Sequence, residues 1–232
     1  MLATLSSFLR SLLTPYDISD ALDDLTMTVQ EELDLVGAGV SIARDVSSAR
    51  GAELRFATAN PSALVELETY QEDEQAGPCV EAFRCRSTVA IDDLREHADR
   101  WPRYCSIAVE MGITSVAGIP MKVGDRTIGA LNAYAVDRRW SDQDLSVATI
   151  FADAASVYLV NSVAYDRQRT INTQLQEALS SRIVIEQAKG IIAETHGAGV
   201  DEAFELIRRH ARGTRSSLRE VAEQVVHRRL RL

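Results

Sequence analysis

The sequence has few of the residues that build metal and catalytic sites. It contains three cysteines and four histidines in 232 residues. The cysteine number is odd, and the spacings match no zinc pattern. The histidines are scattered, and no nucleophile–base pair or phosphate-binding loop is apparent. We therefore expect no metal site, no catalytic residues and no enzyme, but a reduced cytoplasmic protein.

Long apolar runs are also missing. No stretch of 18 consecutive apolar residues occurs, so no membrane span is expected. Residues 1–16 place several leucines on one helical face, but no basic region precedes them and Arg10 interrupts them. This pattern does not favour a signal peptide. We expect residues 1–16 to form a short docking or dimerising helix.

Positive charge is scarce except at the C-terminal end. The whole chain carries a net charge of −9, but residues 182–232 hold ten Lys and Arg against seven Asp and Glu. From Arg208 to Arg231, eight arginines accompany only Glu220 and Glu223. An acidic body with a basic end indicates a polyanionic partner. The planar guanidinium of arginine suits phosphates and base edges. The alternative is a solvated helical surface.

Residues 17–160 contain the patterns of an α+β domain. Ser141 and Asp144 resemble a capping box that opens its last helix. Gly124-Asp125 marks a hairpin between two apolar strands. The order of the elements predicts a largely antiparallel sheet flanked by helices. Periodicity and turn residues predict helices over 17–36, 77–85 and 99–112, and strands over 38–43, 52–58, 87–91, 115–121 and 127–135.

This segment resembles the GAF domain family. The resemblance is carried by GPCVEA at 77–82, RWP at 100–102, AVEMGITSVAGIPM at 108–121 and IGALNAY at 128–134. It implies a sensor domain whose small-molecule ligand is unknown. The Asn-Lys pair of cyclic-nucleotide GAF domains and the Pro-x-Ser-Asp motif of bilin GAF domains are absent. His97 lies in a polar segment, which does not favour an axial haem ligand, and no cofactor is expected.

Cys79 is a candidate sensor thiol. It falls in the first turn of the helix predicted over residues 77–85. The positive end of a helix dipole can lower the pKa of a thiol and make it reactive. The alternative is a buried thiol that helps to close the pocket, because free cysteines often behave as small apolar residues.

Residues 161–181 are predicted to form a connector helix. No proline or glycine occurs from Val157 to Lys189, so one long helix is expected. A heptad with a stutter favours an adjustable stalk in a parallel homodimer. The alternative is an ordinary helix packed on its own chain. The inward positions would be Val157, Val160, Ala164, Gln168, Ile171, Leu175, Ala178, Arg182 and Ile185.

Residues 182–232 are predicted to form an all-α bundle of three helices. Apolar residues recur at helical spacing over 182–196, 200–211 and 218–226. Gly213 suits the end of the second helix, and Ser217 with Glu220 forms a capping box for the third. Because the apolar faces are complete, the remaining arginines are expected to point outward.

The bundle resembles the ANTAR domain, an RNA-binding antiterminator module. The resemblance is carried by EQAKG at 186–190, by DEAF at 201–204, and by single residues at matching positions. These are Arg182, Ile185, Leu206, Arg208, Ala211, Arg212, Leu218, Val221 and Ala222. It implies binding to tandem hairpins with six-base loops in nascent leader RNA. Lys189 would contact a phosphate. The RNA-binding surface would comprise Arg182, Lys189, Gly190, Arg208, Arg212, Arg215, Ser216 and Arg219.

Gly190 has two interpretations. Its bare backbone would let a phosphate or base approach the helix closely, or it would let the second helix pack tightly against the first. Two other functions also remain open for the chain. A DNA-binding regulator and a ligand sensor that acts through protein contacts both fit three short helices with a basic end.

Overall fold

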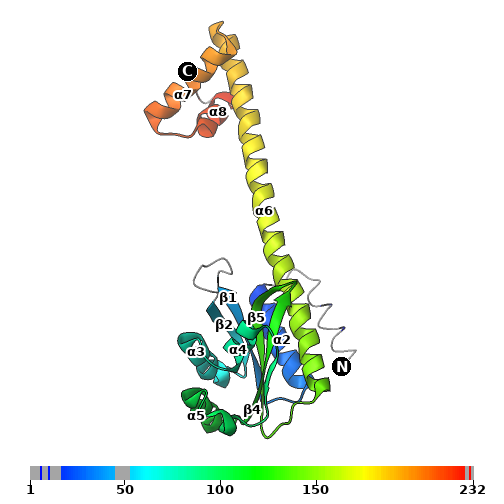
Figure 1. The fold of residues 1–232 in the computed structure, drawn as a ribbon. Coiled ribbons are helices and arrows are strands. Elements are labelled where there is room, and N and C mark those ends of the chain that lie inside the picture. The colour runs from blue at the N-terminus through cyan, green and yellow to red at the C-terminus, as the bar shows by residue number, and fades with distance from the viewer. Residues whose placement is uncertain (1–5, 7–9, 11–16, 45–52, 228–229, 231–232) are drawn as a thin grey trace. The chain divides into compact units, whose positions relative to one another are not determined.

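The computed structural model describes residues 6, 10, 17–44, 53–227 and 230. The chain divides into two compact units, Met1–Val163 and Ala164–Leu232 (Figure 1). Apart from Ser6 and Arg10, the helix predicted over residues 1–16 lies outside the described residues. Each unit is considered by itself below.

The first unit is built on a five-stranded sheet. The strand order is β2-β1-β5-β4-β3, and neighbouring strands run antiparallel. Gly124, with φ of +58°, supplies the turn between the last two strands. The predicted antiparallel α+β fold is confirmed. The strands are β1 (Gly37–Arg44), β2 (Glu53–Asn60), β3 (Val89–Ile91), β4 (Ser115–Val123) and β5 (Arg126–Ala135).

Helices cover both faces of the sheet (Figure 1). One face packs against α2 (Ile18–Glu32) and the first part of α6 (Asp142–His196), in a core that includes Leu25, Leu131 and Phe151. Because strand side chains alternate between faces, Tyr134 of β5 points to the opposite side. That side is covered by α3 (Val65–Glu74), α4 (Pro78–Cys85), α5 (Pro102–Glu110) and the short 3-10 helices η1 (Ser62–Leu64) and η2 (Leu94–His97).

The 55-residue helix α6 begins at the predicted capping box. The Asp144 N–H donates to Ser141 Oγ at 3.1 Å, and the Ser141 N–H donates to Asp144 Oδ2 at 3.2 Å. The helix continues through Gly190, so the last sensor helix, the connector and the first bundle helix are one element. By length and composition, α6 also holds an 18-residue window apolar enough to cross a membrane, which the search for uninterrupted apolar runs missed. Of that window, 44% is buried inside the protein, and the core helix of a soluble protein passes the same test of length and composition.

The second unit packs the end of α6 against α7 (Val200–Thr214) and α8 (Leu218–Val226). Its core includes Ala188, Ile192, Ile207 and Val221, so the predicted all-α C-terminal region is confirmed. Val200 was predicted to be a core residue but is exposed. Helix α7 runs past Gly213 and ends where Arg215 adopts a left-handed φ of 56°. The capping box of α8 is present as predicted.

Candidate nucleic-acid interface

Lys189 lies where α6 meets α7. Its Nζ lies 3.0 Å from both carboxylate oxygens of Glu186 and 5.5 Å from the ring centroid of Phe204. Only 15% of the Lys189 side chain is exposed, so it does not project freely into solvent. A pair spaced i,i+3 on one helix contributes about 0.2–0.5 kcal/mol. Glu186 and Phe204 therefore orient the ammonium where α6 meets α7.

Gly190 is an exposed position in the interior of α6. Beyond its own stretch of helix, no atom of the described chain would lie within 4 Å of a Cβ atom added there. The interpretation that Gly190 lets α7 pack closely against α6 is therefore wrong for the described chain. A glycine in a helix costs about 0.8–1.0 kcal/mol relative to alanine. No packing within the described unit offsets that cost.

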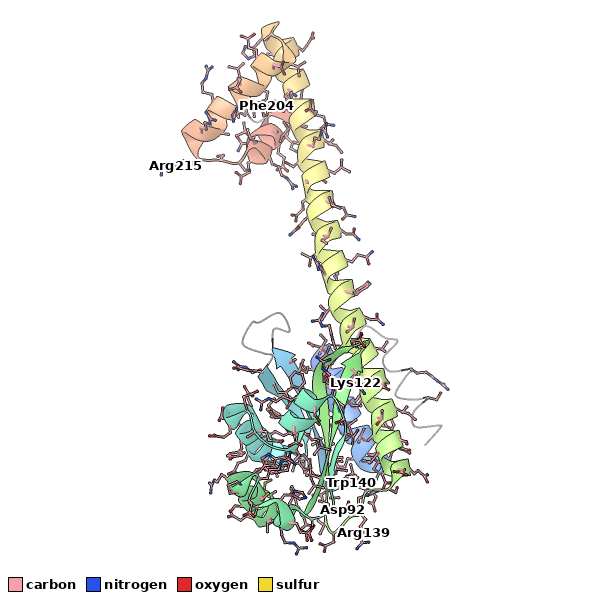
Figure 2. The ribbon with its side chains drawn as sticks, viewed as in Figure 1. Asp92, Lys122, Arg139, Trp140, Phe204 and Arg215 are labelled. Atoms are coloured by element: carbon pink, nitrogen blue, oxygen red, sulfur yellow. The ribbon has the colours of Figure 1, made fainter. Side chains whose placement is uncertain are left out.

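A stripe of arginines follows one side of α7. Phe204, Arg208 and Arg212 recur at steps of four, which places them on one side of α7, and Arg215 follows at the residue that ends the helix. Arg208 pairs with Glu205 at 3.2 Å and is half exposed, while Arg212 and Arg215 are exposed. Phe204 lies where α7 runs beside α6, and Arg215 lies at the far end of α7 (Figure 2). The stripe thus begins at the Lys189–Phe204 contact.

The remaining predicted contacts lie outside this stripe. The Ser216 N–H donates to the Ala211 carbonyl at 3.0 Å, which ties Ser216 into the turn after α7. Arg219 Nε donates to Glu223 at 2.8 Å, and this contact raises the pKa of Arg219. Arg182 is exposed on α6, two turns before Lys189. Among the described residues, no recorded contact joins Arg219 to the arginines of α7.

The sequence predicts Phe204 as a member of the apolar face over residues 200–211 and as part of the DEAF match at 201–204. The structure shows a half-buried ring whose contact with Lys189 links α6 to the arginine stripe. Aromatic rings near basic side chains are the platforms on which unpaired bases stack. The spacing of four residues places Phe204 and Arg208 on one side of α7, but no sequence signal marks the contact between Phe204 and Lys189.

The first unit contains a buried polar cluster that the sequence did not reveal. Glu68 of α3 is fully buried, and its carboxylate accepts hydrogen bonds from Asn132 Nδ2 at 2.8 and 2.9 Å and from the Tyr134 hydroxyl at 2.7 Å. Burial raises the pKa of Glu68 to about 7, although the hydrogen bonds oppose this rise. Glu68 is therefore neutral over much of the acidic range.

Cys79 lies in the same region. It is buried, and its N–H donates to Gln71 Oε1 at 3.1 Å. Burial and the nearby Glu68 raise the pKa of the Cys79 thiol above its usual range. This is the opposite of the lowering expected from a helix dipole, and it disfavours a reactive thiolate. The position agrees with the alternative of a buried thiol that closes the sensor core.

Two domain families match the chain in series. Residues 17–159 match the GAF domain, and residues 173–226 match the ANTAR domain. The chain belongs to the GAF domain family and carries an ANTAR domain at its C-terminal end. This confirms the architecture predicted from the sequence. No curated protein matches the chain.

Solved structures share the GAF fold. The GAF domain of a phosphoenolpyruvate-protein phosphotransferase from Coxiella burnetii has a TM-score of 0.56 at 14% identity, covering 72% of this chain and 96% of that chain. The corresponding Acinetobacter domain has a TM-score of 0.54 at 14% identity, covering 70% and 94%. Free methionine-R-sulfoxide reductase from Neisseria meningitidis has a TM-score of 0.53 at 18% identity, covering 70% and 89%. At these identities the likeness shows the fold alone.

The two domains divide the candidate residues between them. Glu68 and Cys79 belong to the GAF domain, and all eight residues predicted to contact RNA, from Arg182 to Arg219, belong to the ANTAR domain. GAF domains are sensor domains and ANTAR domains are RNA-binding domains. The chain is therefore a regulator that joins a sensing domain to a domain of the RNA-binding type.

Proposed function

We propose that this protein is a signal-responsive transcription antiterminator that acts in the cytoplasm and binds hairpin loops in nascent leader RNA. One observation carries the proposal. The bare helix surface at Gly190 adjoins Lys189, and the Lys189–Phe204 contact leads into the arginine stripe of α7. Hairpin loops are single-stranded, and proteins bind them through phosphates, stacked bases and guanidinium planes.

The side chains divide into two roles. Lys189 is a point charge that suits a phosphate, and its weak pair with Glu186 opens when a phosphate approaches. Arg208 and Arg212 present planar guanidinium groups along one side of α7, and Arg215 presents a third at the end of the helix. Such groups suit both phosphates and unstacked bases. Gly190 leaves room for the RNA backbone to approach α6. Such a surface binds RNA in a salt-dependent manner.

We propose that the protein acts as a homodimer through α6. Over residues 163–165 and 167–180, every described residue of α6 is exposed, including Ile171, Leu175 and Leu179. Within the described residues, this stretch lacks the burial that packing on its own chain would give. Burying one leucine side chain contributes about 1.5–3 kcal/mol, which favours a second copy. A parallel dimer presents two ANTAR domains to tandem hairpins, and engaging both raises the apparent affinity.

In this scheme the GAF domain supplies the control. A small molecule that binds one conformation of the GAF domain more tightly shifts the population toward it. The continuous helix α6 carries the change from the GAF domain to the ANTAR domain. When the ANTAR domains hold two RNA loops, the terminator does not form and transcription continues.

Single substitutions in the full-length protein test the proposed surface. The probe is an RNA with two hairpins bearing six-base loops, titrated across salt concentrations. Lys189→Ala and Arg212→Ala should each weaken binding. Each should reduce the salt slope by roughly 1.4, because one phosphate contact is lost in each copy of the dimer and a contact to single-stranded RNA contributes roughly 0.7. Lys122→Ala is the matched control, since Lys122 is an exposed lysine of β4 and the chain's only other lysine.

Three outcomes overturn the proposal in different ways. Unchanged affinity and salt slope in both variants would show that the RNA surface lies elsewhere. Equal affinity for duplex DNA and hairpin RNA would indicate a DNA-binding regulator. Absence of any salt-dependent binding to nucleic acid would indicate a regulator that acts through protein contacts.

A further inference from the structure

Three paired residues form a row across strands β1, β5 and β4 of the GAF sheet, and the residues at both ends of the row are glycines. Gly39 of β1 and Gly118 of β4 both pair with Asn132 of the central strand β5. A Cβ atom at Gly39 would collide with the Glu68 carboxylate, and one at Gly118 would lie 2.9 Å from the Pro78 carbonyl oxygen. The two glycines therefore leave a depression in the sheet, and the Glu68 carboxyl group fills part of it.

Neutral groups surround this carboxyl group. Asn132 and Tyr134 donate to it from β5, and Ser41 of β1 and Gln71 of α3 also act on it. The titratable groups that face it are Cys79 from α4, Tyr104 from α5 and Tyr134. Burial raises the pKa of all three, so they stay protonated near neutral pH. Within the described residues, no Lys, Arg or His is among the groups that act on Glu68.

Two buried oxygens of the cluster, Asn132 Oδ1 and the Tyr104 hydroxyl, have no hydrogen-bond partner within the described chain. Asn132 Oδ1 makes no hydrogen bond within the described chain, while Asn132 Nδ2 donates to both oxygens of Glu68. The oxygen and nitrogen of a side-chain amide occupy nearly the same space. Turning the amide by half a turn would place Oδ1 where it accepts a proton from neutral Glu68. The cluster thus has an acceptor for the acid proton but no cation for the ionised carboxylate.

We propose that Glu68 makes the GAF domain proton-responsive: the neutral acid fits the depression between α3 and β5, and its ionisation weakens that contact. A buried carboxylate without a cation is costly, which is the physical basis of the response. Strand β5 leads through residues 136–141 into α6, so the change occurs on the strand that precedes the connecting helix. This inference concerns the GAF domain and does not depend on RNA binding.

The direction of the pH effect follows from proton linkage. Burial raises the pKa of Glu68 from 4.5 to about 7 in the folded protein. Between these values the folded chain binds one proton more than the unfolded chain, so stability falls as the pH rises. Above pH 7 both states are ionised and the effect is complete. The shift corresponds to a change on the order of 300-fold in the unfolding equilibrium constant.

Urea unfolding of the full-length protein at several pH values tests the inference. Tryptophan fluorescence reports on the GAF domain, since Trp101 and Trp140 are the only two tryptophans. Glu68→Gln mimics the neutral acid, and Glu66→Gln is the control because Glu66 is exposed on the same helix. For the wild type and Glu66→Gln, the urea concentration at the unfolding midpoint should decrease as the pH is raised from 5 to 7.5. For Glu68→Gln it should decrease much less. An equal fall in all three proteins would overturn the inference.

A measurement on the wild-type protein does not require that variant to fold. Carbon-13 NMR of glutamate carboxyl groups should show one group that titrates near pH 7. The side-chain amide signals of Asn132 should shift over the same range, because that amide is bonded to Glu68. If all glutamate carboxyl groups are already ionised at pH 5.5, Glu68 does not respond to protons near neutrality and the proposal is wrong.

Discussion

At the residue scale, the neighbours Lys189 and Gly190 differ in their contacts with the rest of the chain. Lys189 has partners on α6 and α7, whereas the surface at Gly190 has none within the described chain. A glycine in a helix interior lowers helix stability, because it gains more freedom than other residues on unfolding. Its presence is therefore better explained by a contact with another molecule than by folding of the ANTAR domain.

Replacing Gly190 with alanine should separate stability from RNA binding. Beyond its own stretch of helix, the methyl group meets no atom of the described chain, so the ANTAR domain should become more stable by about 0.5–1 kcal/mol. The same methyl group should obstruct the RNA and weaken binding. Circular dichroism during thermal unfolding and RNA titration measure the two effects on one sample.

Gly213→Ala provides the matched control for this substitution. Gly213 is also an exposed helical glycine with open space around it, and it lies off the side of α7 that carries Arg208 and Arg212. We expect added stability with unchanged RNA binding. If Gly190→Ala binds RNA as well as Gly213→Ala does, the close approach of RNA to α6 is wrong.

At the element scale, clear periodicity and caps made most of the fold predictable. The capping boxes at Ser141 and Ser217 correctly marked the start of α6 and α8. Helix α3 was missed because part of its buried face is polar, namely Glu68 and Gln71, and no apolar period appears. For the same reason, the sequence did not predict the buried polar cluster around Glu68. Its burial depends on glycines of β1 and β4, which are distant in sequence from α3.

The candidate RNA surface was predictable only in part. The basic residues themselves stand out by charge and by their match to the ANTAR domain. Their arrangement in space could not be predicted, because the Lys189–Phe204 contact joins two helices and depends on how α7 packs against α6. The contribution of each residue to RNA binding stays a prediction.

The exposed stretch of α6 also makes a prediction at this scale. Leu175→Asp should separate the homodimer into monomers, since each copy would lose a buried leucine and gain a charge. Losing about 1.5 kcal/mol per copy corresponds to a dissociation constant raised at least about 100-fold. Sedimentation velocity measures the mass. Gln174→Asp, one position away on the same exposed helix, should remain dimeric, and an unchanged mass for Leu175→Asp would place the dimer contact elsewhere.

At the scale of the whole molecule, negative charge lies mainly in the sensor part of the chain and positive charge in the ANTAR part. The net charge is −9 overall, while residues 182–232 alone carry +3 from ten basic and seven acidic side chains. An acidic sensor unit repels nucleic acid, so we expect the proposed RNA contacts at the basic end. One uninterrupted helix belongs to both units and provides the covalent path from sensing to binding.

The most direct test of this account is a titration of the full-length protein against two-hairpin RNA while its mass is recorded. Three RNAs are compared: one with two intact six-base loops, one with a single hairpin, and one whose loop bases are scrambled. The loop sequences come from selection out of an RNA pool with randomised loops. The account predicts that a dimer binds the two-loop RNA most tightly and loses affinity when the loops are scrambled. Equal binding to all three RNAs would contradict it.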